Sequence, residues 1–305
     1  MVDRTEPLRL YDPARYILEG KGKRFRPQLV LAASASFGGD RAVALKAAAA
    51  VEVFHIFTLV HDDIMDRSDT RRGRDTIHVK WDEPTAILTG DYLLGKSMDL
   101  LLSFPDDRLR HVLTYFSDTI RLLCEGQVRD MAFETRSDVT LEEYVQMIDE
   151  KTSALLQCSL VLGGLSGEAR KVDIEKLSSI GHHLGQAFQI QDDFLDLMTD
   201  SEQWGKPIGG DLMSGKKTYL VLKAVEQEAL RSESWFSDAM KRGGVPARVI
   251  PEARDRMHDL GVTETTRSAV IFHSGEAKRL IDELPEGIGR ASLAALTHKM
   301  QQRLH

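Results

Sequence analysis

Apolar residues recur along the chain at the spacing of helices, and runs of β-branched residues are few. Near the C-terminus, for example, Leu293, Leu296 and Met300 fall on one stripe, whereas charged residues fall largely outside it. The pattern predicts helices over residues 8–19, 26–37, 40–66, 84–104, 106–132, 140–165, 173–199, 216–230, 246–260, 263–283 and 289–304.

Turn signals agree with these boundaries. Thr140 lies three residues before Glu143, the spacing of a capping box, and Pro84 stands where a helix would begin. The glycines at 163–164 interrupt the apolar pattern. No alternation of strands and helices, no repeat and no low-complexity linker divides the chain. We therefore expect a single all-α domain, a helical bundle that spans residues 1–305.

Composition permits a sizeable core, because 42% of the residues are hydrophobic and 29% are charged. A formal net charge of −7 disfavours a nucleic-acid-binding protein but allows a local basic pocket for a phosphorylated small molecule. Cys124 and Cys158 lie in apolar helical patterns, so we expect buried free thiols in a reducing compartment. The N-terminus lacks the apolar core of a signal peptide, and no apolar run approaches the ~20 residues of a membrane span. We expect a cytoplasmic protein without a transmembrane segment.

An acidic motif ends the apolar helix predicted over residues 40–66. At helical spacing, Asp62, Asp63 and Asp66 project from one region of its surface, where three unpaired carboxylates would repel one another. Oxygen-only ligation at this density suits Mg²⁺ better than zinc or iron. Arg71 and Arg72 follow within a few residues, and guanidinium groups match phosphate oxygens. The local interpretation is a site for metal and phosphate.

A second motif repeats the pattern, with Asp192, Asp193 and Asp196 late in another apolar helical stretch. A single copy would be equally consistent with a solvated helix end, but two copies favour a function. If the two helices face each other, six carboxylates surround a cavity that holds several Mg²⁺ ions on the oxygens of a diphosphate.

The chain resembles the trans-isoprenyl diphosphate synthases (polyprenyl synthetases), of the geranylgeranyl or farnesyl diphosphate synthase type. Six segments appear in the family's order: Gly22–Pro27, Asp62–Gly73, Gly90–Leu94, Lys151–Thr152, Asp192–Asp196 and Lys216–Thr218. The resemblance implies the isoprenoid synthase fold, an all-helical bundle around a deep central cavity, and a homodimer. It also implies a short-chain prenyltransferase that condenses isopentenyl diphosphate with dimethylallyl, geranyl or farnesyl diphosphate.

Residue roles follow from the same resemblance. Magnesium ions, three per active site, would be bound directly or through water by Asp62, Asp63, Asp66, Asp192, Asp193 and Asp196. The departing allylic diphosphate would be held by Arg71, Lys151, Lys216 and, as a weaker candidate, Lys206. Isopentenyl diphosphate would be held by Lys23, Arg26, His55 and Arg72, and the allylic cation would face the oxygens of Thr152 and Gln189.

The implied reaction is ionisation, condensation and elimination. Mg²⁺ and cationic side chains stabilise the leaving pyrophosphate, the double bond of isopentenyl diphosphate attacks the allylic cation, and a proton leaves with pyrophosphate. No protein nucleophile is required, and the sequence shows no Ser-His-Asp or Cys-His arrangement.

Product length is expected to depend on Phe54, Phe57 and Thr58, just before the first motif. In the family, large residues here form a floor under the growing chain, and one aromatic residue followed by Thr resembles the archaeal geranylgeranyl diphosphate synthases. A rise of ~1.5 Å per residue places Phe57 ~7.5 Å and Phe54 ~12 Å along the helix from Asp62. An ideal helix turns Phe57 about 140° away from Asp62, so spacing alone does not give its direction. Farnesyl and longer-chain products remain the alternatives.

Without the resemblance, several of these residues have simpler interpretations. His55 would be a core histidine, and Phe54 and Phe57 ordinary core residues. Three basic residues are interpreted as solvent-exposed charges: Arg24, Arg74 and Lys217. We assign no role to the histidine pair His182 and His183, which has no evident ligand partners in the sequence.

Three other functions compete with the synthase. A class I terpene cyclase shares the Asp-rich helix but needs no site for isopentenyl diphosphate, so Lys23 and Arg26 argue against it. A di-iron bundle would use Glu52-x-x-His55, but no second such motif follows. A non-catalytic subunit of a hetero-oligomeric synthase would be easier to accept if either aspartate motif were degraded, and both are intact.

Overall fold

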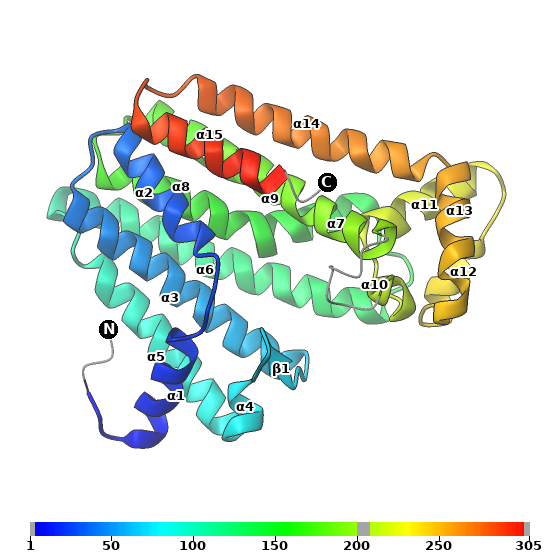
Figure 1. The fold of residues 1–305 in the computed structure, drawn as a ribbon, viewed down its shortest axis with the longest axis horizontal. Helices are drawn as coiled ribbons and strands as arrows, with labels where there is room; N and C mark the ends of the chain where they lie inside the picture. Colours follow the sequence, from blue (N-terminus) through cyan, green and yellow to red (C-terminus); the bar gives the residue numbers. More distant parts are fainter. Residues whose placement is uncertain (1–3, 200–207, 302–305) are drawn as a thin grey trace. The chain divides into compact units, whose positions relative to one another are not determined.

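A computed structural model describes residues 4–199 and 208–301, where regular structure is almost entirely helical (Figure 1). The helices are α1 Leu8–Leu18, α2 Phe25–Ser36, α3 Arg41–Met65, α4 Ile77–Lys80, α5 Glu83–Leu101, α6 Asp106–Thr135, α7 Leu141–Ile148, α8 Ala154–Ser166, α9 Lys171–Met198, α10 Gly210–Met213, α11 Tyr219–Leu230, α12 Trp235–Lys241, α13 Ile250–Asp259, α14 Val262–Asp282 and α15 Ile288–Gln301. A π-helix, η1 (Asp149–Ser153), and a 3₁₀ turn, η3 (Ala247–Val249), complete the helical elements. The strands β1 (Thr70–Arg71) and β2 (Arg74–Asp75) form a two-residue antiparallel hairpin.

The predicted helices are confirmed, with most boundaries within a few residues. The capping box at Thr140 is present: its hydroxyl accepts from the Glu143 backbone N–H, and the Glu143 carboxylate accepts from the Thr140 backbone N–H. The helix predicted from residue 216 begins instead at Tyr219, because the Thr218 side chain caps it by accepting from the Val221 N–H. The short elements α4, α10 and α12 and the hairpin were not predicted, since they are too brief to show a period.

The glycines near residue 165 mark the end of α8, and one expectation about the cysteines is wrong. Gly163 and Gly164 lie inside the last turn of α8, which ends at Ser166, one residue beyond the predicted boundary and directly before Gly167. A Cβ at Gly163 would lie 2.4 Å from the Val30 carbonyl oxygen of α2, so glycine permits a close contact between the helices. Both cysteines are free thiols, but the expectation that both are buried is wrong: Cys158 is buried, whereas Cys124 is exposed on an outward face of α6.

The chain divides into two compact units that alternate along the sequence. The first unit comprises residues 1–117, 158–177 and 285–293, and the second comprises 118–157, 178–284 and 294–305. Helices α6, α8, α9 and α15 contribute residues to both units. The expectation of one domain over residues 1–305 stays a prediction.

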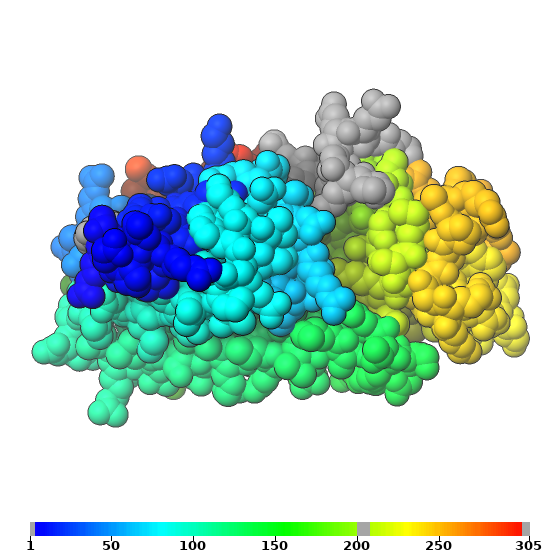
Figure 2. Space-filling view, turned by 90° about the horizontal axis from the view of Figure 1, so that it is seen from below, coloured from blue at the N-terminus to red at the C-terminus, as the bar shows by residue number. Residues whose placement is uncertain are grey.

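Helix α3 is the central element of the first unit, packed against α2 and α5. Asp40 caps its N-terminus by accepting hydrogen bonds from the backbone N–H groups of Ala42 and Val43. Where α5 crosses α3, a Cβ at Gly90 would lie 2.2 Å from Nε2 of His61, so no larger residue fits without displacement. Helix α1 also packs against α5, and the two lie side by side in both views (Figures 1 and 2). This packing fixes the end of α3 that carries the first aspartate motif.

Helix α3 is also, among the described residues, the one helix long and apolar enough to span a membrane. The mean hydropathy of its most apolar segment is 1.8, but half of that segment is buried inside the protein. Val53, Ile56 and Val60 pack against residues of α4 and α5, which include Ile77 and Leu93. Core helices of soluble proteins can be equally long and apolar, and the contacts of α3 are those of a core helix.

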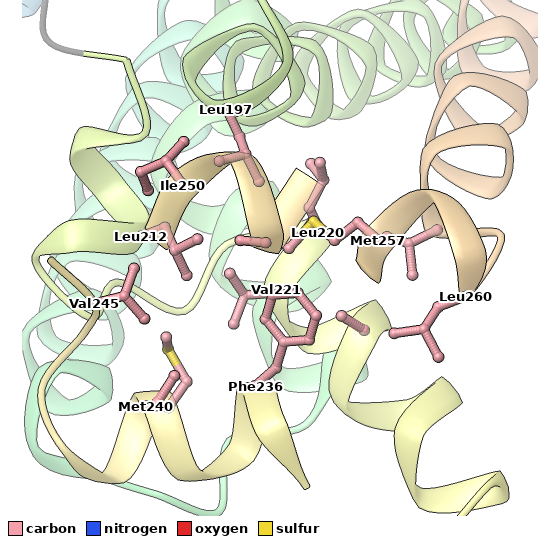
Figure 3. Packing of buried hydrophobic residues seen from close by; sticks show 14 of the residues in the cluster. Leu197, Leu212, Leu220, Val221, Phe236, Met240, Val245, Ile250, Met257 and Leu260 are labelled. Atoms are coloured by element: carbon pink, nitrogen blue, oxygen red, sulfur yellow. The ribbon is translucent and has the colours of Figure 1, made fainter. Parts of the chain in front are cut away.

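An apolar core in the second unit holds the C-terminal end of α9. Phe194 and Leu197 of α9 belong to this core, and Phe236 of α12 is fully buried within it. Figure 3 shows Leu197 together with Leu212, Leu220, Val221 and other side chains from α10, α11, α12 and α13. Because Phe194 and Leu197 are fixed by packing, Asp193, directly before Phe194, and Asp196, directly before Leu197, are held at defined positions.

Candidate active site

The three aspartates of the first motif differ in exposure. Asp63 is buried, with 2% of its surface exposed, while Asp62 is partly exposed and Asp66 is exposed. Asp66 caps the end of α3 and its backbone N–H donates to the Asp62 carbonyl oxygen at 2.8 Å. Asp62 and Asp66 are therefore accessible to a metal ion, whereas Asp63 sits under the helix end.

The hairpin returns Arg71 to the end of α3. Its Nε donates to Oδ1 of Asp63 at 2.6 Å. Burial raises the pKa of Asp63, and the positive charge and hydrogen bond of Arg71 oppose this shift. The contact with Asp63 uses only Nε, and a guanidinium has further N–H donors that can bind a phosphate. Asp63 thus orients the arginine that the sequence assigned to the allylic diphosphate.

Arg72 lies at the turn of the hairpin and extends to the loop before α2. Its backbone φ is 54°, a left-handed value that non-glycine residues adopt infrequently. Its Nη1 donates to the Lys21 carbonyl oxygen at 2.9 Å, and a Cβ at Gly22 would lie 2.6 Å from the same nitrogen. The structure therefore places Arg72 beside the segment that contains Lys23 and Arg26, as its predicted role requires.

Four positively charged side chains surround His55 and form what we call the basic cluster: Arg24, Arg26, Arg71 and Arg72. Nη1 of Arg26 lies 3.3 Å from Nε2 of His55. Burial, followed by the charge of Arg26, holds the pKa of His55 well below its usual value, so the ring is neutral at pH 7. Burial lowers the pKa of Arg26 to about 10, with Glu52 opposing and Arg72 adding to this effect.

One nitrogen of the basic cluster is unsatisfied. Nε of Arg26 is buried and has no hydrogen-bond partner among the described residues. Leaving a buried charged donor unpaired is costly, and an anion beside it would remove the cost. A diphosphate would supply oxygens for this nitrogen and balance the excess of positive charge.

Arg24 has a structural role that the sequence did not reveal. It forms an ion pair with Glu52 of α3 and donates from Nη2 to the carbonyl oxygens of Leu18 and Gly20. The interpretation of Arg24 as a solvent-exposed charge is therefore wrong, since it ties the loop before α2 to α3. Arg74 likewise stacks on the ring of Tyr16, with its guanidinium carbon 3.9 Å from the ring centroid.

Asp193 is the most constrained aspartate of the second motif. It is buried, and its Oδ2 accepts from the Tyr144 hydroxyl at 2.5 Å and from the Tyr219 backbone N–H at 2.9 Å. Its Oδ1 accepts from Nε2 of Gln189 at 3.1 Å. Gln189 in turn accepts at Oε1 from the Thr152 hydroxyl at 3.1 Å. The predicted residues Thr152, Gln189 and Asp193 thus form one hydrogen-bonded chain.

The remaining aspartates of this motif are placed differently. Asp192 is partly exposed, whereas Asp196 is buried and its Oδ2 accepts from the Asp211 backbone N–H at 3.1 Å. Nζ of Lys216 lies 3.9 Å from Oδ1 of Asp211 in α10, the same residue whose backbone N–H donates to Asp196. Lys206, the weaker candidate for the allylic diphosphate, falls outside the described residues.

Lys151 and Thr152 lie in the π-helix η1, where a single long helix was predicted over residues 140–165. Nζ of Lys151 donates to Oδ2 of Asp130 at 2.5 Å. A Cβ at Gly126 would lie 2.6 Å from the Lys151 backbone nitrogen, so α6 approaches η1 closely there. Wider π turns occur frequently at functional sites, and this one presents two predicted site residues.

Lys217 is not a solvent-exposed charge. Only 8% of its surface is exposed, and its Nζ donates to the Glu134 carbonyl oxygen at 3.0 Å. Burial lowers the pKa of this amine. Its contact with the end of α6 fixes the loop that carries the neighbouring Lys216, so Lys217 is a positioning residue.

The residues expected to set product length occupy different environments. Phe54 is completely buried, with its ring centroid 4.9 Å from that of Phe116. Phe57 is partly exposed and its ring centroid lies 4.8 Å from that of His61. The Thr58 hydroxyl donates to the His55 carbonyl oxygen at 2.8 Å. Phe57 is therefore the accessible aromatic residue, while Phe54 is part of the core.

We expect Asp193 to make the stability of the metal-free protein depend on pH. Burial raises the pKa of Asp193 from 3.8 to about 6, although hydrogen bonds from Tyr144, Tyr219 and Gln189 oppose the shift. Ionisation of Asp193 therefore disfavours the folded state. The protonated carboxyl stabilises the fold below about pH 4, and the free energy of unfolding falls by about 3 kcal/mol as pH rises from about 4 to 6 and above. Urea unfolding of wild type and Asp193→Asn, both in chelator, should show the wild type losing stability relative to the variant over this range. Parallel pH profiles would contradict the assignment.

Comparisons with known proteins show which family and which fold the chain is similar to. A family model described as polyprenyl synthetase matches residues 7–253. The chain is 36% identical over 300 residues to a short chain isoprenyl diphosphate synthase of Methanothermobacter thermautotrophicus, covering 98% of this chain and 92% of the relative. It superposes with a TM-score of 0.90 on geranylgeranyl pyrophosphate synthetase from Pyrococcus horikoshii Ot3, at 37% identity, covering 97% of this chain and 90% of that one. A polyprenyl synthase from Caulobacter crescentus CB15, crystallised with calcium and isoprenyl diphosphate, gives a TM-score of 0.85 at 27% identity, with 99% and 91% covered. The all-helical fold expected from the sequence is therefore confirmed.

Proposed function

The chain belongs to the polyprenyl synthetase family and is a short-chain prenyltransferase, and from this premise we propose that it makes geranylgeranyl diphosphate. In this proposal the enzyme joins isopentenyl diphosphate to dimethylallyl, geranyl or farnesyl diphosphate and releases pyrophosphate. The observation that carries it is the basic cluster, in which a buried nitrogen of Arg26 has no partner among the described residues and would be satisfied by an anion. The similarity to an archaeal geranylgeranyl pyrophosphate synthetase supports the product.

The donor sets fit magnesium. Asp62 and Asp66 offer carboxylate oxygens one helical turn apart, and Asp192 offers another in the second unit. We propose that the aspartates of each motif bind Mg²⁺, with three ions per active site on the allylic diphosphate. Bound Mg²⁺ would supply positive charge that stabilises the pyrophosphate leaving group. The calcium in the complex of the Caulobacter crescentus relative supports a site for hard divalent cations.

Three basic residues would hold the leaving diphosphate. Arg71, Lys151 and Lys216 are each oriented by an aspartate, respectively Asp63, Asp130 and Asp211. These partners fix the cations before the substrate arrives, and preorganised charge lowers the barrier to ionisation because little reorganisation is then needed. Lys206 remains a fourth candidate from sequence alone.

The basic cluster would bind isopentenyl diphosphate without metal. Arg26 and Arg72 present guanidinium groups, and neutral His55 accepts at Nε2 from Nη1 of Arg26, because a guanidinium can only donate. Lys23 is exposed in the adjoining loop and would add a further cation. Charge-assisted hydrogen bonds to both phosphates would orient the double bond for attack.

Thr152 and Gln189 would stabilise the allylic cation through their oxygens. The Thr152 hydroxyl donates to Oε1 of Gln189, and Asp193 accepts from the Gln189 amide, so the oxygens are held in fixed positions. Oxygen dipoles stabilise a cation without forming a bond to it. No protein base is needed, because the departing pyrophosphate accepts the proton.

Phe57→Ala should lengthen the product, with chains of 25 or more carbons replacing part of the C20 product. Removing a partly exposed ring opens space beside α3, whereas Phe54 lies in the core. Phe54→Ala is expected mainly to destabilise the fold, by about 3–5 kcal/mol. Chromatographic sizing of the products tests both variants. An active Phe57→Ala enzyme with an unchanged product distribution would show that another residue stops the chain.

We propose that the enzyme is a cytoplasmic homodimer. Along α5 and at the residue that caps its C-terminus, large apolar side chains remain exposed at Ile87, Leu88, Met98 and Leu102. Such a row is typical of an interaction surface, and a second copy of the chain is the occupant that the family suggests.

Light scattering should give a molar mass about twice the chain mass of 34.2 kDa, and Leu88→Asp should lower the measured mass toward that of the monomer. Leu230→Asp, at a residue 79% exposed on α11, is the control. A monomeric wild type would contradict the proposal.

The product assay tests the activity and separates it from its alternatives. Purified protein is incubated with Mg²⁺, isopentenyl diphosphate and each of the three allylic starters in turn, and the prenyl products are sized. We expect elongation from every starter and accumulation at C20. A farnesyl or longer product would correct the chain length. Absence of elongation from all three starters would instead favour a non-catalytic subunit of a hetero-oligomeric synthase.

A further inference from the structure

Three histidines meet on the second unit, apart from the aspartate motifs. His182 and His183 lie on α9, and His273 lies on α14. One potential ligand atom from each ring lies within 4.8 Å of the others, and all three side chains are partly exposed. Their proximity could not be predicted from the sequence, because about 90 residues separate His273 from the pair.

The distances suit nitrogen ligation. Nδ1 of His183 lies 2.9 Å from Nδ1 of His273. Two nitrogens that each lie about 2.0–2.1 Å from one metal ion are separated by roughly 3 Å, so little ring movement is required. The ring centroids of His182 and His183 lie 5.1 Å apart, and that of His182 lies 6.1 Å from that of His273. Imidazole nitrogens at this spacing bind zinc and similar divalent transition metals rather than magnesium.

Asp149 orients one of the three rings. Its Oδ1 lies 2.5 Å from Nδ1 of His182 and also accepts from Nε2 of Gln157 at 3.3 Å. A carboxylate that accepts from one ring nitrogen leaves the lone pair of the other available to a metal. This carboxylate–histidine arrangement recurs beside metal-binding histidines, and here it fixes Nε2 of His182 as the ligand atom.

Burial favours the neutral forms of His183 and His273. Burial lowers the pKa of His273 to about 4, with contributions from His183 and His182. Burial also lowers the pKa of His183, with His182 and Arg279 adding to this shift and Glu276 and Asp149 opposing it. Neutral imidazole is the form that binds metal, so His183 and His273 need not lose a proton near pH 7.

We propose that His182, His183 and His273 form a site for a zinc-class divalent metal ion, with Asp149 as the residue that orients His182. Such a site would join α9 to α14 and, through Asp149, to the first residue of η1. It is separate from the proposed magnesium ligands in residue identity and in donor chemistry, since it uses nitrogen rather than oxygen. Its expected role is to stabilise the second unit.

Zinc binding to the full chain tests this site. Tag-free protein is stripped with chelator, saturated with Mg²⁺ to compete for the aspartate motifs, and titrated with Zn²⁺ in a calorimeter. We expect one Zn²⁺ per chain and a higher melting temperature. Asp149→Asn should weaken binding about 10- to 100-fold, and His273→Asn should weaken it at least as much.

Matched variants make the result decisive. His258→Asn removes an exposed histidine of α13 outside the cluster and should bind Zn²⁺ as the wild type does. If His273→Asn fails to fold, as judged by circular dichroism, His183→Gln takes its place. Equal Zn²⁺ affinity in the wild type and the cluster variants, or no stoichiometric Zn²⁺ binding to the wild type, would overturn the proposal.

Discussion

We expect Asp62→Asn to lower the turnover number by at least about a thousandfold while the helices stay folded. Asp62 is partly exposed at the end of α3, so its substitution would remove a proposed metal ligand without opening the core. Loss of several kcal/mol of charge stabilisation at the leaving pyrophosphate corresponds to a factor of this size. Steady-state rates at saturating Mg²⁺ and substrates provide the measurement, and circular dichroism confirms the fold.

Asp69→Asn is the matched control for Asp62. Asp69 is an exposed aspartate seven residues later, and its backbone carbonyl, rather than its side chain, accepts from Thr76. The control should retain wild-type turnover. If Asp62→Asn also turns over at a near-normal rate, the first motif does not bind the catalytic metal.

We expect Arg26→Gln to raise the KM for isopentenyl diphosphate about a hundredfold and to leave the KM for the allylic substrate nearly unchanged. The guanidinium has a buried, unsatisfied Nε and contacts His55, so in our proposal it binds the phosphate that no metal binds. One charge-assisted hydrogen bond contributes about 1.5–3 kcal/mol, which is one to two powers of ten in binding. Initial rates with each substrate varied in turn separate the two KM values.

The control for Arg26 is Arg110→Gln, at an exposed residue of α6. Both substitutions remove one positive charge from the first unit, but only Arg26 belongs to the basic cluster. Equal KM values for isopentenyl diphosphate in Arg26→Gln and Arg110→Gln would place that substrate elsewhere. A selective rise in the allylic KM would reassign Arg26 to the other diphosphate.

Helix positions were predictable because they depend on local pattern. The spacing of apolar residues indicated α3, α9 and α14, and the capping box at Thr140 was visible in four consecutive residues. The π-helix η1 was not predictable, because its wider turn follows from packing against Gly126 of α6 rather than from its own sequence. Elements of about four residues, such as α4 and α10, carry too few positions to show a period.

The candidate site was predictable as a set of residues but not as a set of contacts. The repeated aspartate pattern identified both motifs, and the order of segments identified the basic residues. The partners Glu52, Asp130 and Tyr144 were missed, since each lies far in sequence from the residue it contacts. In the sequence, such a partner is visible only as a polar residue on an otherwise apolar helix face. A single sequence does not show whether that polar residue is buried or exposed to solvent.

The contacts of the histidine cluster were even less predictable from the sequence. His182 and His183 were visible as a pair, but Asp149 and His273 belong to other helices, and only the tertiary fold brings the four together. Periodicity places a residue on a face of its own helix and carries no information on which second helix covers that face.

A single-turnover reaction tests the central proposal most directly. Enzyme in excess over farnesyl diphosphate is mixed with isopentenyl diphosphate and Mg²⁺, and both pyrophosphate and prenyl products are quantified. We predict one pyrophosphate and one geranylgeranyl diphosphate per farnesyl diphosphate, with both lost in chelator and restored by Mg²⁺. Release of pyrophosphate without an elongated product would contradict the synthase proposal and favour a terpene cyclase.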